Sequence, residues 1–538
     1  MIERDNQMIR YLLIIQAIFA TLSAVTTEQK INSFLPKFEQ YIQKNMPAWA
    51  IPGMAVVIVT PTKILLCKGF GTREVGKNKP VDENTIFQIA SLTKIFTASI
   101  AGILADKKAF SLHDLVKKHL PEFNLSSKDA TEKATLEDLI GHRIGIDQFA
   151  GDSLMKLGLP QMEIVKRIGM IPFTHNFRTD YTYSNQMFGF MGIIMERLLH
   201  KKYSEIFEEY IAKPLGMTRS SAGDGIIASQ QSWWNKLKGL FGVDENIALC
   251  HDKNPEGQAV CIELPSIVYV LPSTSGVNTT AHDLGILLQC HLNDGKHDGQ
   301  QIIPLNHVHE MRKSVVKHVK IKPKDMQFPS DVMHDVGYGM GWFSYDYGKG
   351  KHTVPVLEHM GGYAGQRSLA FMSPSEGFAV AIITNLGHFN LNLYPEALRN
   401  VFLDLFLDLE EKDWSDEYVK RKNDYYTRMR NQRTTKKLAK LTPKHEDKFY
   451  TGTYVNEMYG EIEIASESGM LVFKANGRSC TLPHWNGDEF NMNGWEFNGN
   501  MSRSDPNFIE FGQNEKGQTI AYVSFLFEGK DPIFTRVK

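Results

Sequence analysis

Cysteine is scarce in this chain, and the cysteines that occur form no recognisable pattern. Five cysteines are distributed over 538 residues without a CxxC pair, which excludes a disulfide-rich scaffold and the common zinc-finger spacings. Neither an HxH nor an HExxH spacing occurs among His142, His251, His282, His291 and His297, so no metal site is expected. The sequence gives no sign of any other cofactor.

An excess of either charge is also missing. Lysine and arginine total 60 against 61 aspartate and glutamate, for a net charge of -1. Without a basic surplus, nucleic acid is not expected as a partner. Hydrophobic residues make up 42% of the chain and charged residues 22%, which is ordinary for a globular protein. The length predicts two or three domains.

Long apolar runs are missing as well, except near the start. Residues 11–25 are mostly apolar, follow Arg4 and Arg10, and end in small residues. This pattern predicts a signal peptide over residues 1–25, because a membrane-spanning helix needs about 20 residues. The protein is then expected to be secreted or lumenal. An uncleaved membrane anchor, the only source of membrane contact that we expect, and a buried first helix are the alternatives. In an oxidising compartment Cys250 and Cys261 could form a disulfide.

Residues 30–412 combine helix and strand patterns, which indicates an α+β domain. Helical periodicity occurs in four stretches: 91–108, 186–200, 281–292 and 391–409. Apolar strands are expected at 53–60, 64–72, 340–345, 368–372 and 378–384. The segment 222–265 is irregular, and we expect a surface insertion there.

The last quarter of the chain changes character twice. Residues 413–445 are predicted to be a basic linker helix, with ten basic against three acidic side chains within 416–444. A solvated helix is favoured over a site for an acidic partner or a lipid. Residues 446–538 alternate apolar and polar positions between regularly spaced turns. That pattern predicts a separate antiparallel β domain, a small barrel with its own core.

Three short motifs contain the residue types of acyl-transfer chemistry. Ser91 and Lys94 are three residues apart at the start of a predicted helix, so both side chains share one face. Taken alone, Ser91 would be read as a helix N-cap. Tyr183 and Asn185 precede a second helix, and His359 lies with Gly361 and Gly362 on a strand edge; these two motifs make the N-cap reading less favoured.

Ser-x-x-Lys, Tyr-x-Asn and a basic residue-x-Gly in this order resemble the three motifs of serine β-lactamases and penicillin-binding proteins. The order is most similar to the class C group, which includes DD-peptidases, D-aminopeptidases and esterases. The segments 139–145, 213–217 and 275–283 support the resemblance, which covers about residues 30–410. It implies an antiparallel sheet flanked by helices, an all-helical lobe, and a site between them. The C-terminal domain is similar to the lipocalin-like module of such hydrolases.

The resemblance implies hydrolysis of an amide or ester, in a peptide or a small molecule, through an acyl-Ser91 intermediate. A serine hydroxyl needs a base, and Lys94 can be that base only if burial lowers its pKa from about 10.4. Tyr183 would protonate the leaving group and activate the deacylating water, which requires neighbouring cations to lower its pKa. A core tyrosine is the simpler reading of Tyr183 alone.

The remaining motif residues would bind substrate. Asn185 would position a substrate carbonyl or Lys94, or else cap the following helix. His359 would bind a substrate carboxylate or polarise Tyr183. The resemblance assigns the oxyanion hole to the backbone N–H groups of Ser91 and Gly362, with Gly361 completing the motif. The β-lactamases usually have lysine where His359 stands, so weak β-lactamase activity is expected. A catalytically inactive binding or self-assembling scaffold is the alternative function.

Overall fold

The computed structural model describes most of the chain. The described residues are 25–225, 245–254, 256–263, 266–319, 328–387, 392–434, 442–492, 495, 507–526 and 532–538. The predicted signal peptide therefore lies outside them, apart from its last residue. Within these ranges no helix is both long enough and apolar enough to cross a membrane.

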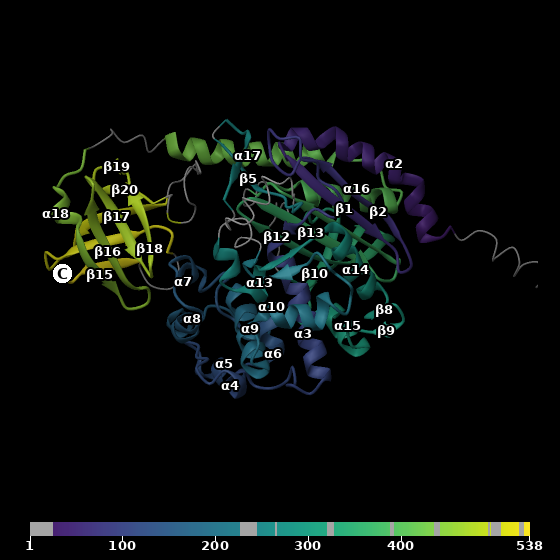
Figure 1. Cartoon of the computed structure of the whole chain (residues 1–538), viewed down its shortest axis with the longest axis horizontal. Helices are drawn as coiled ribbons and strands as arrows, with labels where there is room; N and C mark the ends of the chain where they lie inside the picture. The colour runs from purple at the N-terminus through teal and green to yellow at the C-terminus, as the bar shows by residue number, and fades with distance from the viewer. Residues whose placement is uncertain are drawn as a thin grey trace, which may run out of the picture.

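An antiparallel sheet forms the centre of the first domain (Figure 1). Its order among the described residues is β10-β11-β12-β13-β14-β1-β2. The bounds are β1 Gly53–Val59, β2 Ile64–Gly71, β10 Met333–Tyr338, β11 Phe343–Lys349, β12 His352–Tyr363, β13 Gln366–Ser373 and β14 Phe378–Thr384. The N-terminal hairpin β1–β2 thus pairs with the last strand, β14, which brings the two ends of the domain together.

Apolar residues on both faces of β1 bury the sheet between two layers of helices. Ala55, Val57 and Val59 join one apolar cluster, and Met54, Val56 and Ile58 join the other, as the alternation of side chains along a strand requires. The second face is covered by α2 Thr27–Asn45, α16 Tyr394–Phe406 and α17 Trp414–Thr434. The first face is covered by α14 Ala281–Leu292 and α3 Thr93–Asp106. A strand that is apolar throughout is expected where both faces are covered.

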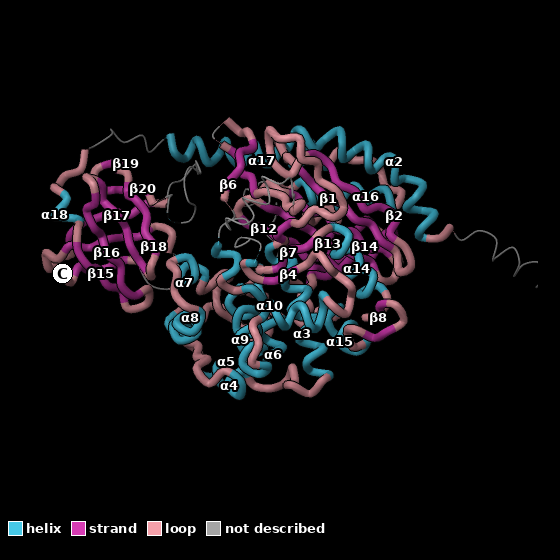
Figure 2. Tube along the Cα trace, in the orientation of Figure 1, coloured by secondary structure: helices cyan, strands magenta, loops and turns pink. Residues whose placement is uncertain are grey.

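The helical lobe lies around α3, in the lower half of the view in Figure 2. Its helices are α4 Val116–His119, α5 Lys128–Lys133, α6 Leu136–Ile140, α7 Asp152–Lys156, α8 Gln161–Arg167, α9 Asn185–Leu199 and α10 Tyr203–Phe207. Smaller elements complete the domain: β3 Phe87–Gln88, β4 Ser221–Ala222, β5 Cys250–Lys253, β6 Ala259–Ile262, α13 Pro272–Ser275, β7 Val277–Thr279, β8 Lys296–His297, β9 Gln300–Gln301 and α15 Leu305–Arg312. The predicted α+β fold with a helical lobe is confirmed.

The C-terminal domain is a nearly closed antiparallel barrel (Figure 1). Its strand order is β18-β17-β16-β15-β23-β22-β21-β20-β19 among the described residues. The bounds are α18 Asp447–Tyr450, β15 Gly452–Asn456, β16 Gly460–Glu467, β17 Met470–Ala475, β18 Arg478–Leu482, β19 His484–Asn486, β20 Glu489–Asn491, β21 Phe508–Gln513, β22 Thr519–Val523 and β23 Ile533–Arg536. The terminal strand β23 pairs with both β15 and β22 and so joins the two halves of the sheet.

Two segments differ from the sequence expectations. The described part of 222–265 contains a hairpin, since β5 pairs with β6; residues 226–244 lie outside the described residues. Helix α17 forms in the predicted linker, but one face is buried on α16, with Trp414 and Tyr418 at most 1% exposed. The sequence showed the basic face of this helix, and its aromatic face explains why it packs.

Candidate active site

Ser91 lies in a short 3₁₀ turn, Ala90–Leu92, directly before α3. Ala90 has a positive φ of 46°, a left-handed conformation that is uncommon for a residue with a Cβ. The Ala90 N–H donates to the Gln88 side chain at 2.9 Å, which helps to hold this strained turn. Such strain persists where the surrounding structure fixes it, and it is frequent at functional sites.

Strand β12 approaches the Ser91 turn so closely that only glycine fits at one position. A Cβ on Gly361 would lie 2.2 Å from the Ile89 carbonyl oxygen and 3.1 Å from the Leu92 nitrogen. A Cβ on Gly341 would lie 3.2 Å from the Lys94 carbonyl oxygen, so the glycines of 337–341 serve close packing rather than phosphate binding. Gly362 is partly exposed and pairs with Arg367 on β13.

The Lys94 amine is fully buried and has three hydrogen-bond partners. Its Nζ lies 3.0 Å from Ser91 Oγ, 2.9 Å from Asn185 Oδ1 and 3.2 Å from the Thr274 carbonyl oxygen. Burial lowers the pKa of Lys94 from 10.5 to about 7, against the opposing influence of the Asp152 charge. Among the described residues no carboxylate hydrogen-bonds Nζ directly, which explains why burial has the largest effect on this pKa.

The partners of Lys94 decide where its lone pair points. The Asn185 amide oxygen and the Thr274 carbonyl can only accept hydrogen bonds. A neutral amine has two N–H donors, and these two acceptors use both of them. Its lone pair is then left for the third partner, the Ser91 hydroxyl, which can donate. The geometry is therefore suited to moving a proton from Ser91 to Lys94.

Tyr183 lies against both residues. Its hydroxyl hydrogen-bonds Ser91, and the Lys94 Nζ lies 4.8 Å from the centre of its ring. Burial, followed by the Asp152 charge, raises the pKa of Tyr183 well above 10, although Ser91 and Arg367 oppose this. The lowered pKa that the acid/base role of Tyr183 was taken to require is therefore not found, because burial outweighs the Arg367 charge. At neutral pH Tyr183 is a protonated phenol that can donate a proton.

Asn185 is the first residue of α9, but the cap of this helix is Ser184, whose hydroxyl accepts from the Met187 N–H. The Asn185 side chain is instead engaged on both sides. Its Oδ1 accepts from Lys94, and its Nδ2 donates to Asp152 Oδ2 at 2.8 Å. Asp152 was missed from the sequence, because an isolated acidic residue between positions 145 and 180 has no motif to mark it.

His359 is buried on β12, with 1% of its surface exposed, rather than solvated. Its Nδ1 bonds the Met360 carbonyl at 2.8 Å, so Nε2 is the acceptor nitrogen of the neutral ring. Burial, and then the charge of Lys94, lowers the pKa of His359 to about 3. The ring is therefore neutral at pH 7. It lies 6.4 Å from the Tyr183 ring, centre to centre.

His142 packs against Tyr183, a contact that the sequence did not suggest. Its Nδ1 accepts from the Ser184 N–H at 3.1 Å, and its ring lies 4.4 Å from that of Tyr183. Burial lowers the pKa of His142 well below 6.5. Its position in the 139–145 segment was the available signal.

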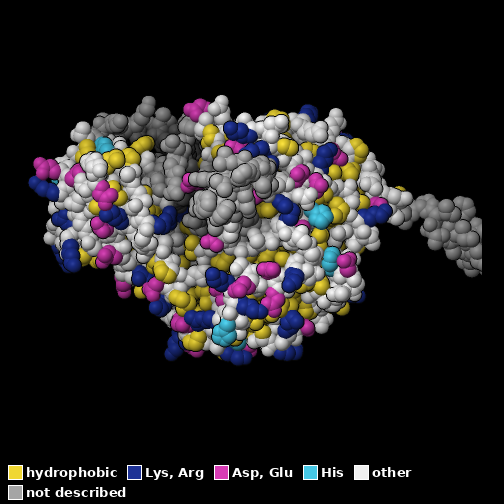
Figure 3. Space-filling model, viewed as in Figure 1, with side chains coloured by type: hydrophobic (Ala, Val, Ile, Leu, Met, Phe, Trp, Pro, Cys, Tyr) yellow, Lys and Arg dark blue, Asp and Glu magenta, His cyan; other side chains and the backbone are white. Residues whose placement is uncertain are grey.

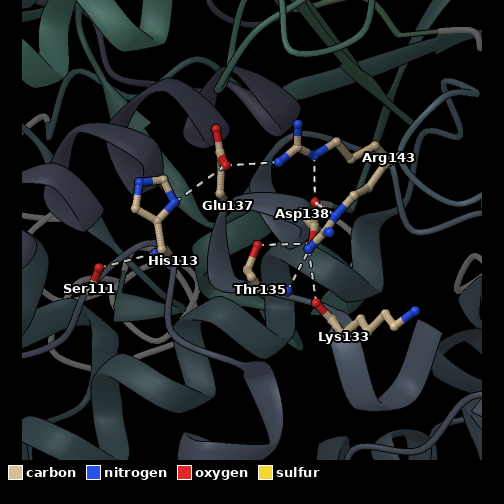
Figure 4. A network of polar contacts seen from close by, with 8 residues as sticks. Ser111, His113, Lys133, Thr135, Glu137, Asp138 and Arg143 are labelled. Atoms are coloured by element: carbon tan, nitrogen blue, oxygen red, sulfur yellow. Dashed lines mark hydrogen bonds and ion pairs between the residues drawn. The ribbon is translucent and has the colours of Figure 1, made fainter. Parts of the chain in front are cut away.

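A buried carboxylate braces the two loops that meet here. Asp138 accepts from Arg143 at 2.5 Å and from the Thr135 backbone and hydroxyl at 2.9 Å (Figure 4). Arg178, before the Tyr183 loop, adds a bond of 2.8 Å. Burial alone would raise the pKa of Asp138, but the bonds from Arg178, Thr135 and Arg143 hold it below 3.8. This brace fixes the His142 turn against the loop that leads to Tyr183.

Other sequence expectations around the site are corrected. Gln366 and Arg367 lie on β13 and are largely buried. Arg367 forms an ion pair with Glu396. Cys250 and Cys261 are free thiols. Cys261 is opposite His251 in the hairpin register, and the disulfide considered possible between Cys250 and Cys261 is not present in the structure.

The surface and the described side chains add two general observations. Basic and acidic side chains are intermixed on the face in Figure 3, in agreement with the net charge of -1. Within the described ranges, no group of three or more His, Cys, Asp or Glu residues has a metal-binding arrangement.

Two family models match this chain. A family model described as Beta-lactamase matches residues 38–399. A second, described as a domain of unknown function (DUF3471), matches residues 436–531.

Curated relatives match only part of their own length. Protein flp of Staphylococcus aureus (strain COL) is 28% identical over 192 residues, 35% of this chain and 39% of that protein. Unguisins hydrolase ungD' of Aspergillus campestris (strain IBT 28561) is 30% identical over 204 residues, 36% of this chain and 37% of that protein. The matched region thus spans about two fifths of these relatives.

Solved structures share the fold along nearly the whole chain. The octameric penicillin-binding protein homologue from Pyrococcus abyssi has a TM-score of 0.57 at 19% identity, covering 93% of this chain and 100% of its own. SurE has a TM-score of 0.53 at 17% identity, covering 94% and 99%. The Beta-lactamase match extends over more than half of the sequence, and this chain belongs to that family of serine hydrolases.

Proposed function

We propose that this protein hydrolyses an amide or ester through an acyl-Ser91 intermediate, with Lys94 as base and Tyr183 as proton donor. One observation carries the proposal: the buried Lys94 Nζ lies 3.0 Å from Ser91 Oγ, and its two other partners, Asn185 Oδ1 and the Thr274 carbonyl, can only accept hydrogen bonds. A structural lysine would gain nothing from this arrangement, because burying an amine without a bonded carboxylate is unfavourable.

In the acylation step the Ser91 proton moves to Lys94 as Oγ bonds the substrate carbonyl carbon. The carbonyl electrons move to its oxygen, which the backbone N–H groups of Ser91 and Gly362 would stabilise. When the carbonyl re-forms, the bond to the leaving group breaks and that group takes the Tyr183 proton. Lys94 then returns its proton to Tyr183. The high pKa of Tyr183 favours a concerted exchange in which little phenolate accumulates.

In deacylation a water molecule replaces the leaving group. Its proton passes through Tyr183 to the again neutral Lys94, its oxygen bonds the acyl carbon, and the bond to Ser91 Oγ breaks. Ser91 regains a proton from Lys94. Each proton is accounted for, and the chain's own groups supply both base and acid.

The substrate class follows from the groups at the edge of the site. The neutral His359 would bind a polar, uncharged part of an amide or ester better than a carboxylate, since its ring has no full charge at pH 7. Phe149, 37% exposed, lies 5.3 Å from the Tyr183 ring and offers an apolar wall. We propose a peptide or a small ester or amide with an apolar group beside the scissile bond.

The cellular location of the protein is part of the same proposal. The sequence pattern of residues 1–25 supports a secreted or lumenal hydrolase, with contact to a membrane only through an uncleaved N-terminal segment. Residues 446–538 would be a lipocalin-like domain.

A fluorophosphonate probe tests the proposal. The full chain should be labelled covalently at Ser91, and the Ser91→Ala variant should not be labelled. A folded wild-type protein that resists the probe would favour a non-catalytic scaffold instead. A panel of aminoacyl amides, short esters and a chromogenic cephalosporin would then assign the substrate.

A further inference from the structure

Helix α7 connects the C-terminal domain to the candidate active site. Its first residue, Asp152, bonds Asn185, and its last, Lys156, contacts the β domain. Five residues are too few for a helix to be stable without partners. What holds the two ends of α7 therefore decides where Asp152 lies.

At the site end, Asp152 fixes the orientation of a neighbouring amide. The carboxylate is 8% exposed and accepts from Asn185 Nδ2 at 2.8 Å and from Gln186 Nε2 at 3.2 Å. With Nδ2 bound to Asp152, the Asn185 oxygen must point toward Lys94, as observed at 2.9 Å. If Asp152 moved away, the amide could turn and donate to the Lys94 lone pair, which would block it as a base.

At the other end, the β domain occupies the carbonyls that a helix C-terminus leaves unpaired. The Lys156 carbonyl accepts from Trp495 Nε1 at 3.0 Å and from Arg478 at 3.1 Å. The Leu157 carbonyl accepts from Asn476 Nδ2 at 3.0 Å. A cation such as Arg478 is also favourable at a helix C-terminus.

Apolar packing also joins the helical lobe to the β domain. Leu154 and Leu157 of the lobe belong to the same buried cluster as Phe473 and Trp495 of the β domain. Figure 1 shows the barrel beside α7 and α8. The expectation of a separate core for the β domain therefore does not describe this interface, where the two cores are joined.

We propose that the C-terminal domain is a structural part of the active site, because it clamps α7 and thereby holds Asp152, a positioning residue that orients Asn185 toward Lys94. The inference rests on the proposed function. It assigns the β domain an effect on the chemical step, distinct from a cap that only admits or excludes substrate.

The clamp is tested in the full chain by removing two donors at the interface. The double variant Asn476→Gly/Trp495→Phe keeps an aromatic ring at 495, and glycine tolerates the positive φ of 47° at position 476. We expect acylation of Ser91 by a small activated ester to slow about tenfold, with KM unchanged. This is the effect of losing one oriented hydrogen bond, here the bond between Lys94 and Asn185. Lys474→Ala, which loses only exposed ion pairs with Glu463 and Glu467, is the matched control and should keep the wild-type rate.

Hydrogen exchange supplies a readout that does not depend on catalysis. The double variant should lose protection in a peptide covering 152–157, whereas Lys474→Ala should not. Unchanged protection and unchanged rate in the double variant would overturn the clamp. If wild-type Ser91 resists labelling, the proposed function fails, while lost protection in the double variant would still support the clamp.

Two variants of Asp152 separate its orientation from its charge. Asp152→Asn keeps an acceptor for Asn185 and can donate to Gln186 Oε1, which has no partner in the structure. Asp152→Ala keeps neither. We expect the rate of the alanine variant to fall about tenfold and that of the asparagine variant to fall less. The asparagine variant should also shift the acid limb of kcat/KM to lower pH, because the Asp152 charge raises the pKa of Lys94 and asparagine lacks that charge. Equal losses with no shift would overturn the positioning role.

Discussion

The pH dependence of acylation tests the environment of Lys94 directly. Only the neutral amine can take the Ser91 proton, so kcat/KM should follow the fraction of neutral Lys94 in the free enzyme. With a pKa of about 7, half of the molecules have a neutral amine at pH 7. A lysine with the ordinary pKa would have only ~0.03% neutral amine at that pH. Burial therefore increases the population of the active form roughly 1,500-fold.

The histidines and the tyrosine of the site do not titrate where Lys94 does. Burial lowers the pKa of His359 to about 3 and that of His142 well below 6.5, and it raises that of Tyr183 above 10. A single midpoint near pH 7 is thus assigned to Lys94, and below it the rate should fall about tenfold for each pH unit. Asp152, whose pKa burial raises, is checked with the Asp152→Asn variant.

The assay is the second-order rate constant for an uncharged activated ester, measured from pH 5 to 9. Lys94→Arg is the matched variant, because arginine stays charged at every pH tested and cannot accept the proton. It should react at the background rate of Ser91→Ala, with a native circular dichroism spectrum. A wild-type midpoint above pH 9, or a rate that does not change with pH, would refute the assignment of Lys94 as base.

Three further variants or substrates test the rest of the site. Gly361→Ala places a Cβ 2.2 Å from the Ile89 carbonyl oxygen, so covalent labelling of Ser91 should fall at least ~tenfold. The control Gly512→Ala, which has open space around its Cβ, should be labelled at the wild-type rate. Equal labelling of the two variants would contradict the close approach of β12 to the Ser91 turn. Asp138→Asn should lower the free energy of unfolding by about 3 kcal/mol at pH 7. Because the Asp138 pKa is below 3.8, this difference should shrink as pH falls below ~4, and a constant difference in urea unfolding would count against the brace. The neutral His359 ring predicts weak cephalosporin hydrolysis at pH 7, which a chromogenic assay would disprove if turnover were efficient.

The sequence allowed the main elements and the three motifs to be predicted, because each depends on local pattern. The strand at 53–60 and the helices at 186–200 and 281–292 agree with β1, α9 and α14 to within one residue. Ser91 and Lys94 share a helix turn, so their proximity follows from spacing. The contact of Lys94 with Asn185, 91 residues later, needed the family resemblance, since spacing alone does not bring separate helices together.

Burial and long-range packing could not be predicted in the same way. The basic character of 416–444 concealed an aromatic face, and the period-two pattern of the last domain did not show which side would contact α7. The acid/base role of Tyr183 was taken to require that neighbouring cations lower its pKa, yet burial outweighs the Arg367 charge and raises it. The sign of such a shift depends on the depth of the group, which no sequence motif records.

Asn185 also explains how a carboxylate can assist a neutral lysine without charging it. A carboxylate bonded to Nζ would stabilise the ammonium form and raise the Lys94 pKa. Here Asp152 bonds the far side of the Asn185 amide, and the amide oxygen contacts Lys94. The intervening amide transmits orientation but contributes only a dipole at Nζ, so burial can keep the pKa near 7. On this argument Asn185→Asp, which places a negative charge against Nζ, should shift the midpoint of kcat/KM to higher pH, opposite to the shift expected for Asp152→Asn. Shifts in the same direction for the two variants would show that the amide does not act as a spacer.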